Sequence, residues 1–463
     1  MTAEHFHLIG VGGAGMAPVA ELLAARGLRV SGSDARDSDT LARLRALGVD
    51  ARAGHDAARV GPGATVVVST AVREDNPELR SARELGLPVV HRSQALVRAA
   101  EGRDFVAVAG AHGKTTTSAM LAVALTELGL DPSYAIGGTV LALGSGAHLG
   151  RGRAFVAEAD ESDGSFLNYR PAVAIITNIE ADHLDHYGSH EAFDQAFVSF
   201  AERVTGLLVV CADDPGALRL ARAVAGSRPL LTYGTGSSPG LGRGHVRLAD
   251  VQLRADGARA TLHHEPTGDA PAAAGVVLDL AVAGAHSLLN AAGAWCAGVE
   301  VGAAPAAMAQ ALGHFTGTGR RFEPRGQAAG VRVVDDYAHH PTEVAATLRT
   351  ARLAAAGGRV LVLFQPHLYS RTQAFAAEFA QALSLADVVV VTAVYGARED
   401  PVDGVDGTLI TDRLPGARYV APREEAAHVV AAAAEPGDLV LTVGAGDVTE
   451  LGPLVLQRLA GEQ

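Results

Sequence analysis

The strongest candidate for chemistry is a glycine-rich turn that follows an apolar run at 105–109 and precedes a helix-forming segment. Backbone N–H groups at a helix N-terminus bind phosphate oxygens. A lysine and a threonine at 114 and 115 suit the outer phosphates and a magnesium ion. Val108 stands where the longer phosphate-binding pattern needs its first glycine, so only a shorter form of that pattern is present. The expected phosphate contacts are Gly110, Ala111, His112, Gly113, Lys114, Thr115 and Thr116.

Lys114 is the single lysine among 38 lysine and arginine residues. Codon bias explains the excess of arginine, yet any chemistry that needs a lysine must then use Lys114. Pyridoxal enzymes and Schiff-base aldolases need a lysine amine in a site built for an aldehyde. A lysine within a phosphate turn does not fit that use, so these classes are excluded.

Four carboxylates lie within six residues at the end of a predicted buried strand over 155–159: Glu158, Asp160, Glu161 and Asp163. The carboxyl ends of strands face the ligand crevice of an open sheet. Hard oxygen ligands are what magnesium bound to phosphate requires. We therefore expect a functional site here rather than a solvated acidic loop.

A second polar cluster follows the predicted strand at 172–177, where His183 and His186 lie beside Asp182 and Asp185. A lone histidine is more often structural. This cluster ends a strand expected in the same sheet as the phosphate turn, so the pattern favours a catalytic or metal-ligand role.

The N-terminal glycines at 10, 12, 13 and 15 only loosely match a dinucleotide fingerprint, because the last glycine comes one residue early. Asp34 ends the next predicted strand, at 28–33, and could reach a ribose. The pattern indicates a nucleotide's phosphates near a helix N-terminus and does not specify the nucleotide.

Two segments near the C-terminus, 335–341 and 364–372, place histidine, tyrosine or arginine directly after predicted strands. Arg320 and Arg321 fall at a predicted domain junction, where an arginine can close on a phosphate when domains move. Capping and structural salt bridges explain any one of these residues equally well.

Strands and helices alternate along most of the chain, which predicts α/β domains with largely parallel sheets. The length of 463 residues suggests about three domains. We place their boundaries at 1–98, 99–318 and 319–463. The segment 245–282 alternates as antiparallel strands, which we expect to be an insertion in the middle domain.

Composition excludes several other classes. The net charge is −13 with no basic stripe, so nucleic acid is not expected as a partner. No apolar run is long enough for a membrane span, and the first residues do not have the pattern of a signal peptide. Two distant cysteines, Cys211 and Cys296, exclude a disulfide scaffold and a thiolate zinc site. Together these features predict a cytoplasmic protein.

The motifs taken together resemble the Mur ligases of peptidoglycan synthesis. The matching segments, in chain order, are GVGGAGM, GAHGKTTT, EADESD, NIEADH, GTGRRF, DDYAHHPTEV, FQPHLYSRT and VGAGD. The resemblance covers essentially the whole chain. It implies a Rossmann-like N-terminal domain for a UDP-linked substrate, a central P-loop ATPase domain, and a C-terminal Rossmann-like domain that closes over ATP and an amino acid.

This resemblance also implies ATP, Mg²⁺ and specific residue roles. The implied reaction phosphorylates the carboxylate of UDP-N-acetylmuramate, and an amino acid then attacks the acyl phosphate. The implied catalytic residues are Lys114, Glu158 and His183; the implied metal ligands are Thr115, Glu158 and His183. The implied additional ATP contacts are Asn290 and Arg320 or Arg321. The implied contacts to the UDP substrate are Gly12, Gly13, Ala14, Gly15, Asp34, Ser69 and Thr70. The implied contacts to the amino acid and substrate are Tyr337, His339, His367 and Arg371.

The single lysine narrows the branch of the family. Later-adding Mur ligases use a carbamylated lysine to bridge metals, and this chain has no second lysine for that role. The branch that adds L-alanine to UDP-N-acetylmuramate fits best, as a monomer or weak homodimer. Its nearest rival recycles a preformed tripeptide, and that ligase usually carries an aromatic where Ser162 stands. Ala111, Ser287 and Leu368 depart from the family pattern, where threonine, asparagine and arginine are usual.

Two further alternatives come from other classes of protein. The N-terminal glycines would suit a nicotinamide-dependent oxidoreductase, which leaves the lysine-bearing turn and the acidic strand end unexplained. A non-catalytic nucleotide sensor on a degenerate ligase frame would fit Leu368, but not the intact Lys114, Glu158 and His183.

Overall fold

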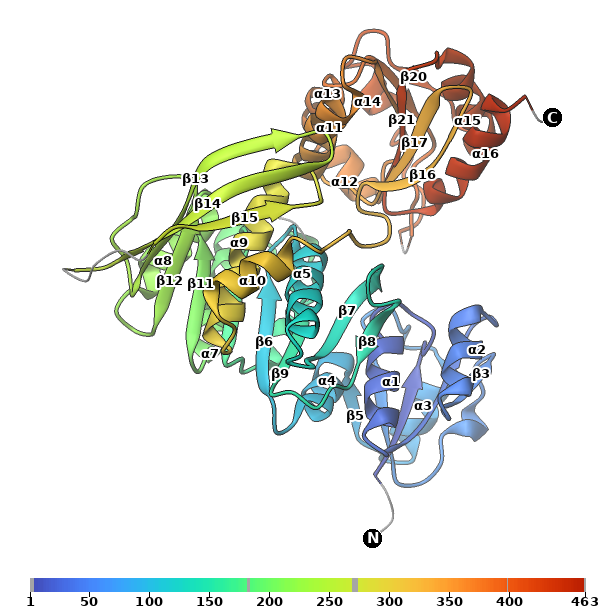
Figure 1. Ribbon diagram of the computed structural model, residues 1–463. Helices are drawn as coiled ribbons and strands as arrows, with labels where there is room; N and C mark the ends of the chain where they lie inside the picture. The colour runs from blue at the N-terminus through green and yellow to red at the C-terminus, as the bar shows by residue number, and fades with distance from the viewer. Residues whose placement is uncertain (1–3, 181–183, 269–273, 398, 462–463) are drawn as a thin grey trace. The chain divides into compact units, whose positions relative to one another are not determined.

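The computed structural model describes residues 4–180, 184–268, 274–397 and 399–461. Their strands form three sheets, each flanked by helices (Figure 1). The chain divides into two compact units. The first unit comprises Met1–Val251, Ala260–Asp279 and Leu288–Phe315, and the second comprises Gln252–Arg259, Leu280–Ser287 and Thr316–Gln463. Among the helices of the described residues, none is both long and apolar enough to cross a membrane.

The first sheet is parallel throughout, with the order β3-β2-β1-β4-β5. Its strands are β1 (His5–Ile9), β2 (Arg29–Asp34), β3 (Asp50–Ala53), β4 (Ala64–Val68) and β5 (Val89–His91). Its helices are α1 (Ala17–Ala25), α2 (Asp39–Ala46), η1 (Ala57–Arg59), α3 (Pro77–Glu84) and α4 (Arg92–Ala100). Successive strand side chains point to opposite faces. Phe6 and Leu8 therefore pack with α1, α2 and α4, whereas Ile9 packs with α3.

The second sheet has ten strands in the order β15-β14-β13-β12-β11-β10-β6-β9-β7-β8. Its first five strands along the chain are β6 (Asp104–Ala109), β7 (Ser133–Val140), β8 (Ser145–His148), β9 (Ala154–Ala159) and β10 (Val173–Ile176). The remaining strands are β11 (Leu207–Cys211), β12 (Leu230–Gly234), β13 (Gly244–Arg254), β14 (Gly257–Pro266) and β15 (Val276–Leu280). Its helices are α5 (Lys114–Glu127), η2 (Ser165–Asn168), α6 (Leu184–Tyr187), α7 (His190–Arg203), α8 (Pro215–Val224), α9 (Ala285–Glu300) and α10 (Pro305–Leu312).

The antiparallel segment expected as an insertion is continuous with this second sheet. β13 pairs in parallel with β12, with Thr232 opposite His245. β14 is its next neighbour and follows after a turn of only two residues, which makes β13 and β14 a hairpin. The segment therefore extends the sheet from one edge instead of forming a separate layer.

The third sheet has the order β16-β17-β21-β18-β19-β20, and only β16 runs antiparallel to its neighbour. Its strands are β16 (Glu323–Ala328), β17 (Val331–Asp336), β18 (Val360–Phe364), β19 (Val388–Val391), β20 (Arg418–Tyr419) and β21 (Leu439–Val443). Its helices are α11 (Pro341–Ala355), α12 (Tyr369–Ala374), α13 (Ala376–Leu383), α14 (Thr408–Thr411), α15 (Arg423–Ala433), η3 (Asp447–Glu450) and α16 (Leu451–Leu459).

Both faces of the third sheet are covered. Val360, Val362 and Phe364 of β18 pack in a core with α11 and α13, while Leu361 and Leu363 pack with α15 and α16. A strand buried on both faces reads as a continuous apolar run, as β18 does. The prediction of three α/β domains, the outer two Rossmann-like, is confirmed.

Candidate functional site

The phosphate turn lies between two strands whose ends carry the other predicted motifs. β6 pairs in parallel with β9 on one side and with β10 on the other. The turn at 110–113, the acidic motif after β9 and the segment after β10 therefore meet at one edge of the sheet. This is the edge at which ligands bind in open α/β sheets.

Two glycines of the turn are required by its geometry. Gly110 has a φ of +134°, and a Cβ there would lie 2.2 Å from Thr177 Oγ1. Gly113 has a φ of +82°, and a Cβ there would lie 2.6 Å from Asn290 Oδ1. The predicted contacts Gly113 and Asn290 are thus adjacent, although Asn290 lies far along the chain on α9.

The turn is braced from β10. Asn178 Oδ1 accepts a hydrogen bond from the His112 N–H at 2.9 Å, and Asn178 Nδ2 donates to the His112 carbonyl at 2.9 Å. Thr177 Oγ1 donates to the same carbonyl at 2.6 Å. No side chain caps the start of α5. The N–H groups of its first turn can therefore bind an anion, which the helix dipole also favours.

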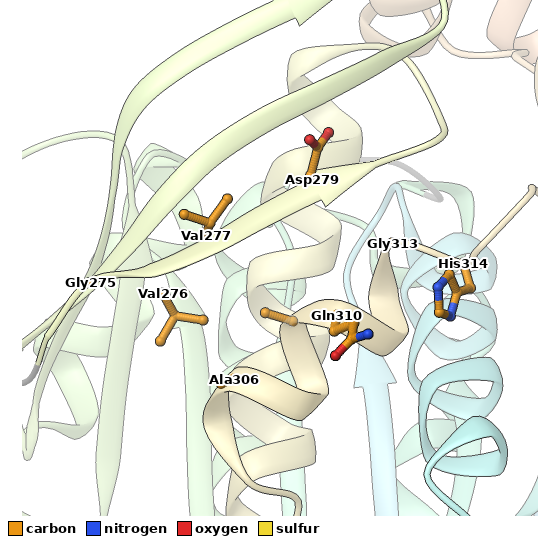
Figure 2. Close-up of a pocket in the computed structure, with 9 residues that line it drawn as sticks. Gly275, Val276, Val277, Asp279, Ala306, Gln310, Gly313 and His314 are labelled. Atoms are coloured by element: carbon orange, nitrogen blue, oxygen red, sulfur yellow. The ribbon is translucent and has the colours of Figure 1, made fainter.

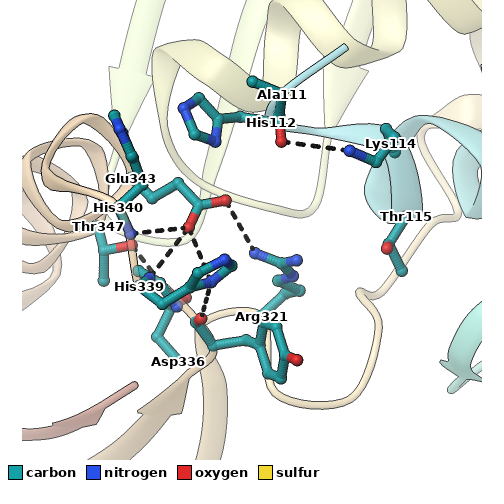
Figure 3. A network of polar contacts seen from close by, with 12 residues as sticks. Ala111, His112, Lys114, Thr115, Arg321, Asp336, His339, His340, Glu343 and Thr347 are labelled. Atoms are coloured by element: carbon teal, nitrogen blue, oxygen red, sulfur yellow. Dashed lines mark hydrogen bonds and ion pairs between the residues drawn. The ribbon is translucent and has the colours of Figure 1, made fainter. Parts of the chain in front are cut away.

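Lys114 curls back over the turn. Its Nζ donates to the Gly110 carbonyl at 2.7 Å and to Glu161 Oε2 at 2.8 Å; its bond to the Ala111 carbonyl is drawn in Figure 3. Burial by itself lowers the pKa of Lys114, but the negative charges of Glu161, Asp160 and Glu158 outweigh burial and raise it. The ammonium is therefore charged and held at the phosphate turn.

Thr115 and Glu158, predicted as metal ligands, lie together. Thr115 Oγ1 is 3.1 Å from Glu158 Oε2. The other carboxylate oxygen, Glu158 Oε1, accepts from the Gly137 N–H at 2.7 Å, which orients the group. A hydroxyl beside a carboxylate, next to a phosphate turn, is the hard-oxygen set that Mg²⁺ prefers. These two residues fit a magnesium ion.

The sequence pattern predicts that all four carboxylates of the acidic motif face the ligand edge. In the structure only two of them do. Glu158 faces Thr115 and Glu161 binds Lys114. Asp160 Oδ2 instead accepts from Arg92 Nη2 at 2.8 Å, and Asp163 Oδ2 lies 3.3 Å from His91 Nε2. Both of these partners come from the domain of the first sheet.

The segment after β10 is described only in part. His183 lies outside the described residues. Tyr187, at the end of α6, donates its hydroxyl proton to the Glu161 carbonyl at 2.5 Å. His186 Nε2 lies 3.3 Å from the Cβ position of Gly164, just beyond the acidic motif. This segment is therefore adjacent to the acidic motif.

The N-terminal glycine turn also lies at the carboxyl edge of its sheet. β1 lies between β2 and β4 and is parallel to both. The same edge of the sheet therefore carries the turn after β1, Asp34 at the end of β2, and Ser69 and Thr70 after β4. Asp34 Oδ2 accepts from the Gly12 N–H at 3.0 Å. This bond holds the turn next to Asp34, which remains a predicted contact to the UDP substrate.

Arg320 and Arg321 differ in their surroundings within the second unit. Arg320 Nη2 donates to the carbonyls of Gly444 at 2.7 Å and Gly446 at 3.1 Å, and its Nε lies 3.3 Å from Asp335 Oδ2. The Arg321 guanidinium instead lies 3.7 Å from Glu343 Oε1. Arg320 is thus bound to the loop after β21, whereas Arg321 is paired with Glu343 of α11.

The four predicted amino-acid contacts form one connected group. The rings of Tyr337 and His339 are 5.3 Å apart, and those of His339 and His367 are 5.8 Å apart. Arg371 Nη1 is 3.4 Å from His367 Nδ1. The ring of Tyr395, which the sequence pattern did not single out, stacks on His367 at 5.8 Å.

Glu343 organises this group and was also missed. Figure 3 shows its carboxylate between His339 and Arg321; Glu343 Oε2 is 3.2 Å from His339 Nδ1. It lies in the first turn of α11 and closes a capping box with His340. The run His-Pro-Thr-Glu was the available signal, since a glutamate at this spacing marks a helix start. Burial lowers the pKa of His339 to about 3, so this imidazole is neutral at pH 7.

Leu368, noted above as a departure from the expected pattern, is buried and has a φ of +69°. Its N–H donates to the Tyr395 carbonyl at 2.9 Å. A side chain at this position is directed into the protein, and a positive φ outside glycine is a strained backbone conformation.

A separate cavity of about 500 Å³ lies between β15 and α10 in the first unit (Figure 2). Val276, Asp279, Gln310 and His314 are among the residues that line it. No residue singled out by the sequence pattern is among them.

The fold and the phosphate-binding edge define a three-domain nucleotide-dependent ligase, and the chain belongs to the Mur ligase family. Three family models match: the Mur ligase family catalytic domain over residues 5–104, the Mur ligase middle domain over 108–298, and the Mur ligase glutamate ligase domain over 320–446.

Two curated relatives are UDP-N-acetylmuramate–L-alanine ligases. That of Kineococcus radiotolerans is 55% identical, over 98% of this chain and 96% of its own length. That of Paenarthrobacter aurescens is 52% identical, over 98% of this chain and 97% of its own length. The crystal structure of a UDP-N-acetylmuramate–alanine ligase from Thermotoga maritima has a TM-score of 0.80 at 30% identity, with 99% of both chains covered. A murein peptide ligase from Psychrobacter arcticus has a TM-score of 0.72 at 25% identity, again with 99% of both chains covered.

Proposed function

We propose that this chain is an ATP-dependent ligase that joins L-alanine to the carboxylate of UDP-N-acetylmuramate in peptidoglycan synthesis. The observation that carries the proposal is near-full-length identity of 52–55% to relatives that bear this activity in their names. The oxidoreductase alternative has no support in a chain that Mur ligase models match in all three domains.

The proposed reaction has two steps. The substrate carboxylate attacks the γ-phosphorus of ATP and releases ADP, which gives an acyl phosphate. The amine of L-alanine then attacks the acyl carbon and loses a proton, and phosphate leaves. Phosphoryl transfer depends mainly on positioning and charge stabilisation. Lys114 supplies that charge at the turn, within a helix N-terminus whose N–H groups face the phosphates.

We assign ATP to the turn and its neighbours. The proposed contacts are Gly110, Ala111, His112, Gly113, Lys114, Thr115, Thr116 and Asn290, with Arg320 or Arg321 from the C-terminal domain. The proximity of Asn290 Oδ1 to the Gly113 Cβ position supports its inclusion. Arg320 already donates hydrogen bonds to two backbone carbonyls, which favours Arg321 as the residue that contacts phosphate.

Thr115 and Glu158 would hold one Mg²⁺, and His183 is proposed as a ligand of a second. When bound, magnesium offsets charge on the phosphates during transfer. The protein's own contribution is the orientation of Glu158 by the Gly137 N–H and the closeness of its carboxylate to the Thr115 hydroxyl.

The UDP-linked substrate is assigned to the carboxyl edge of the first sheet. The proposed contacts are Gly12, Gly13, Ala14, Gly15, Asp34, Ser69 and Thr70. L-alanine and the reacting end of the substrate are assigned to Tyr337, His339, His367 and Arg371, whose mutual contacts in the second unit support a shared site.

The single lysine supports the alanine-adding branch, because no second lysine is present to be carbamylated. The nearest alternative is a ligase that takes a preformed tripeptide in place of L-alanine. We further propose domain boundaries at 1–98, 99–318 and 319–463, a cytoplasmic location, and a monomer or weak homodimer.

The test is phosphate release with ATP, Mg²⁺ and UDP-N-acetylmuramate, comparing L-alanine, glycine, L-serine and a muramyl tripeptide. Release with L-alanine at the highest kcat/KM is expected. Preference for the tripeptide would assign the chain to the recycling branch. No release with any of the four would refute the ligase function.

A further inference from the structure

The carboxylates of the acidic motif after β9 contact two different domains, in alternation along the chain. Glu158 and Glu161 serve the phosphate turn through Thr115 and Lys114. Asp160 and Asp163 contact the start of α4, in the domain of the first sheet. The two domains belong to the same compact unit. A single six-residue segment thus links the phosphate turn to the neighbouring domain.

Each of the two aspartates uses one oxygen to brace its own loop and the other to reach α4. Asp160 Oδ1 accepts from the Ser162 N–H at 3.1 Å, and its Oδ2 accepts from Arg92 Nη2 at 2.8 Å. Asp163 Oδ1 accepts from the Ser165 N–H at 3.0 Å, and its Oδ2 lies 3.3 Å from His91 Nε2. A carboxylate bound on both sides has little freedom to turn, so it transmits the position of α4 to the loop.

Arg92 also lies against the N-terminal glycine turn. The Cβ position of Gly15 is 3.5 Å from Arg92 Nη1 and 3.6 Å from Arg92 Cζ. One planar guanidinium therefore spans the turn after β1 and the acidic motif after β9. Its planar shape allows it to contact two groups in fixed directions, which a lysine ammonium does not match.

The N-terminus of α4 is itself firmly placed. His91 caps the helix in a capping box with Gln94. Ser93 Oγ accepts a bond from Asn168 Nδ2 at 2.8 Å, and Asn168 ends η2, in the domain of the second sheet. The start of α4 is thus joined to the second domain at three successive residues.

We infer that Arg92 is a positioning residue for the ligase reaction: through Asp160 it holds the domain that carries the UDP substrate in register with Lys114 and Glu158. The inference rests on the proposed function. Transfer to the substrate carboxylate requires reacting atoms about 3–3.5 Å apart, and small misplacements cost large factors in rate. Arg92 acts on this distance without touching the reacting atoms.

The test compares Arg92→Gln with Arg98→Gln in the full-length enzyme. Arg98 lies on the same helix, but its partners are Glu4, just before β1, and Glu101, the residue directly after α4, so neither partner belongs to the acidic motif. We expect Arg92→Gln to lower kcat at least tenfold, while the separately measured Kd values for ATP and for UDP-N-acetylmuramate change less than threefold. Arg98→Gln should change all three less than twofold. Arg92→Lys should restore only part of the lost kcat.

Two results would overturn the inference: a kcat for Arg92→Gln within twofold of the Arg98→Gln value, or a loss that appears wholly as weaker UDP-substrate binding, which would make Arg92 a ligand contact. A wild-type chain without ligase activity would refute the proposed function instead. The link itself is then tested by urea unfolding of Arg92→Gln, Asp160→Asn and the double variant. Additive shifts in the unfolding midpoint would show that the two residues are not coupled.

Discussion

Thr115 Oγ1 and Glu158 Oε2 lie 3.1 Å apart although 43 residues separate them in the chain. The parallel pairing of β6 and β9 brings them together, because both strands end at the same edge. The two oxygens, from a helix start and a strand end, form the part of the proposed magnesium site that the described residues contain.

Glu158→Gln should lower kcat at least a hundredfold and raise the Mg²⁺ concentration needed for half-maximal activity. The amide keeps an oxygen for the Gly137 N–H, so the fold should be retained while the charge is lost. Steady-state phosphate release across a Mg²⁺ titration measures this. An unchanged Mg²⁺ requirement would argue against a metal at Glu158.

Lys114→Arg should abolish ligation as completely as Lys114→Ala, although 37 of the 38 basic residues are already arginine. The ammonium reaches the Gly110 carbonyl and Glu161 from within the turn, and a planar guanidinium does not fit that geometry. Binding of UDP-N-acetylmuramate, measured by calorimetry, should persist in both variants. Its loss in a folded variant would contradict the assignment of the two ligands to different domains.

Gly113→Ala should destabilise the protein by more than Gly129→Ala. Both positions have positive φ, so both variants carry a backbone strain of about 1–2 kcal/mol. Only the Gly113 variant also places a methyl group against Asn290 Oδ1, since no atom lies within 4 Å of the Gly129 Cβ position. Urea unfolding measures the difference, and nucleotide binding should weaken in the Gly113 variant alone. Equal free energies of unfolding would contradict the packing of Asn290 on the turn.

The free energy of unfolding should fall as the pH drops below 6.5, because His339 binds a proton more readily in the unfolded state. Its pKa is about 3 in the folded protein, because it is buried, and about 6.5 when unfolded. Between these values only the unfolded state takes up the proton, so stability is lost as the pH falls, by about 1 kcal/mol from pH 6.5 to 5.5. His339→Gln should show a shallower loss over this range in unfolding experiments. An identical pH slope would mean that His339 takes up its proton over the same pH range in the folded and unfolded states.

Arg320→Ala and Arg321→Ala should have different effects. Arg320 donates to carbonyls of the loop after β21 and lies beside Asp335, so its removal should cost about 1.5–3 kcal/mol of unfolding free energy. Arg321→Ala should cost less stability and should raise the KM for ATP at least fivefold. Thermal or urea unfolding and ATP saturation curves separate the two, and the reverse pattern would assign the phosphate contact to Arg320.

Local patterns in the sequence were sufficient to predict the helices and strands and to select most of the candidate site residues. The strand predicted at 155–159 lies within β9, the one predicted at 172–177 contains β10, and the helix-forming segment after the glycine-rich turn is α5. Apolar alternation, glycines at strand ends and capping residues act over a few neighbouring residues, so they can be read directly. The presence of only one lysine favoured the alanine-adding branch of the family, and this count could be made from the sequence alone.

Only the tertiary structure decided which groups meet. The four carboxylates look equivalent in the sequence, yet two serve the phosphate turn and two bind α4. Arg320 and Arg321 are adjacent in the chain but have different partners. Glu343 and Tyr395 gained their places beside His339 and His367 through the packing of α11 and the loop after β19. Such pairings depend on strand order and on contacts between residues far apart in the chain, which short sequence patterns do not encode.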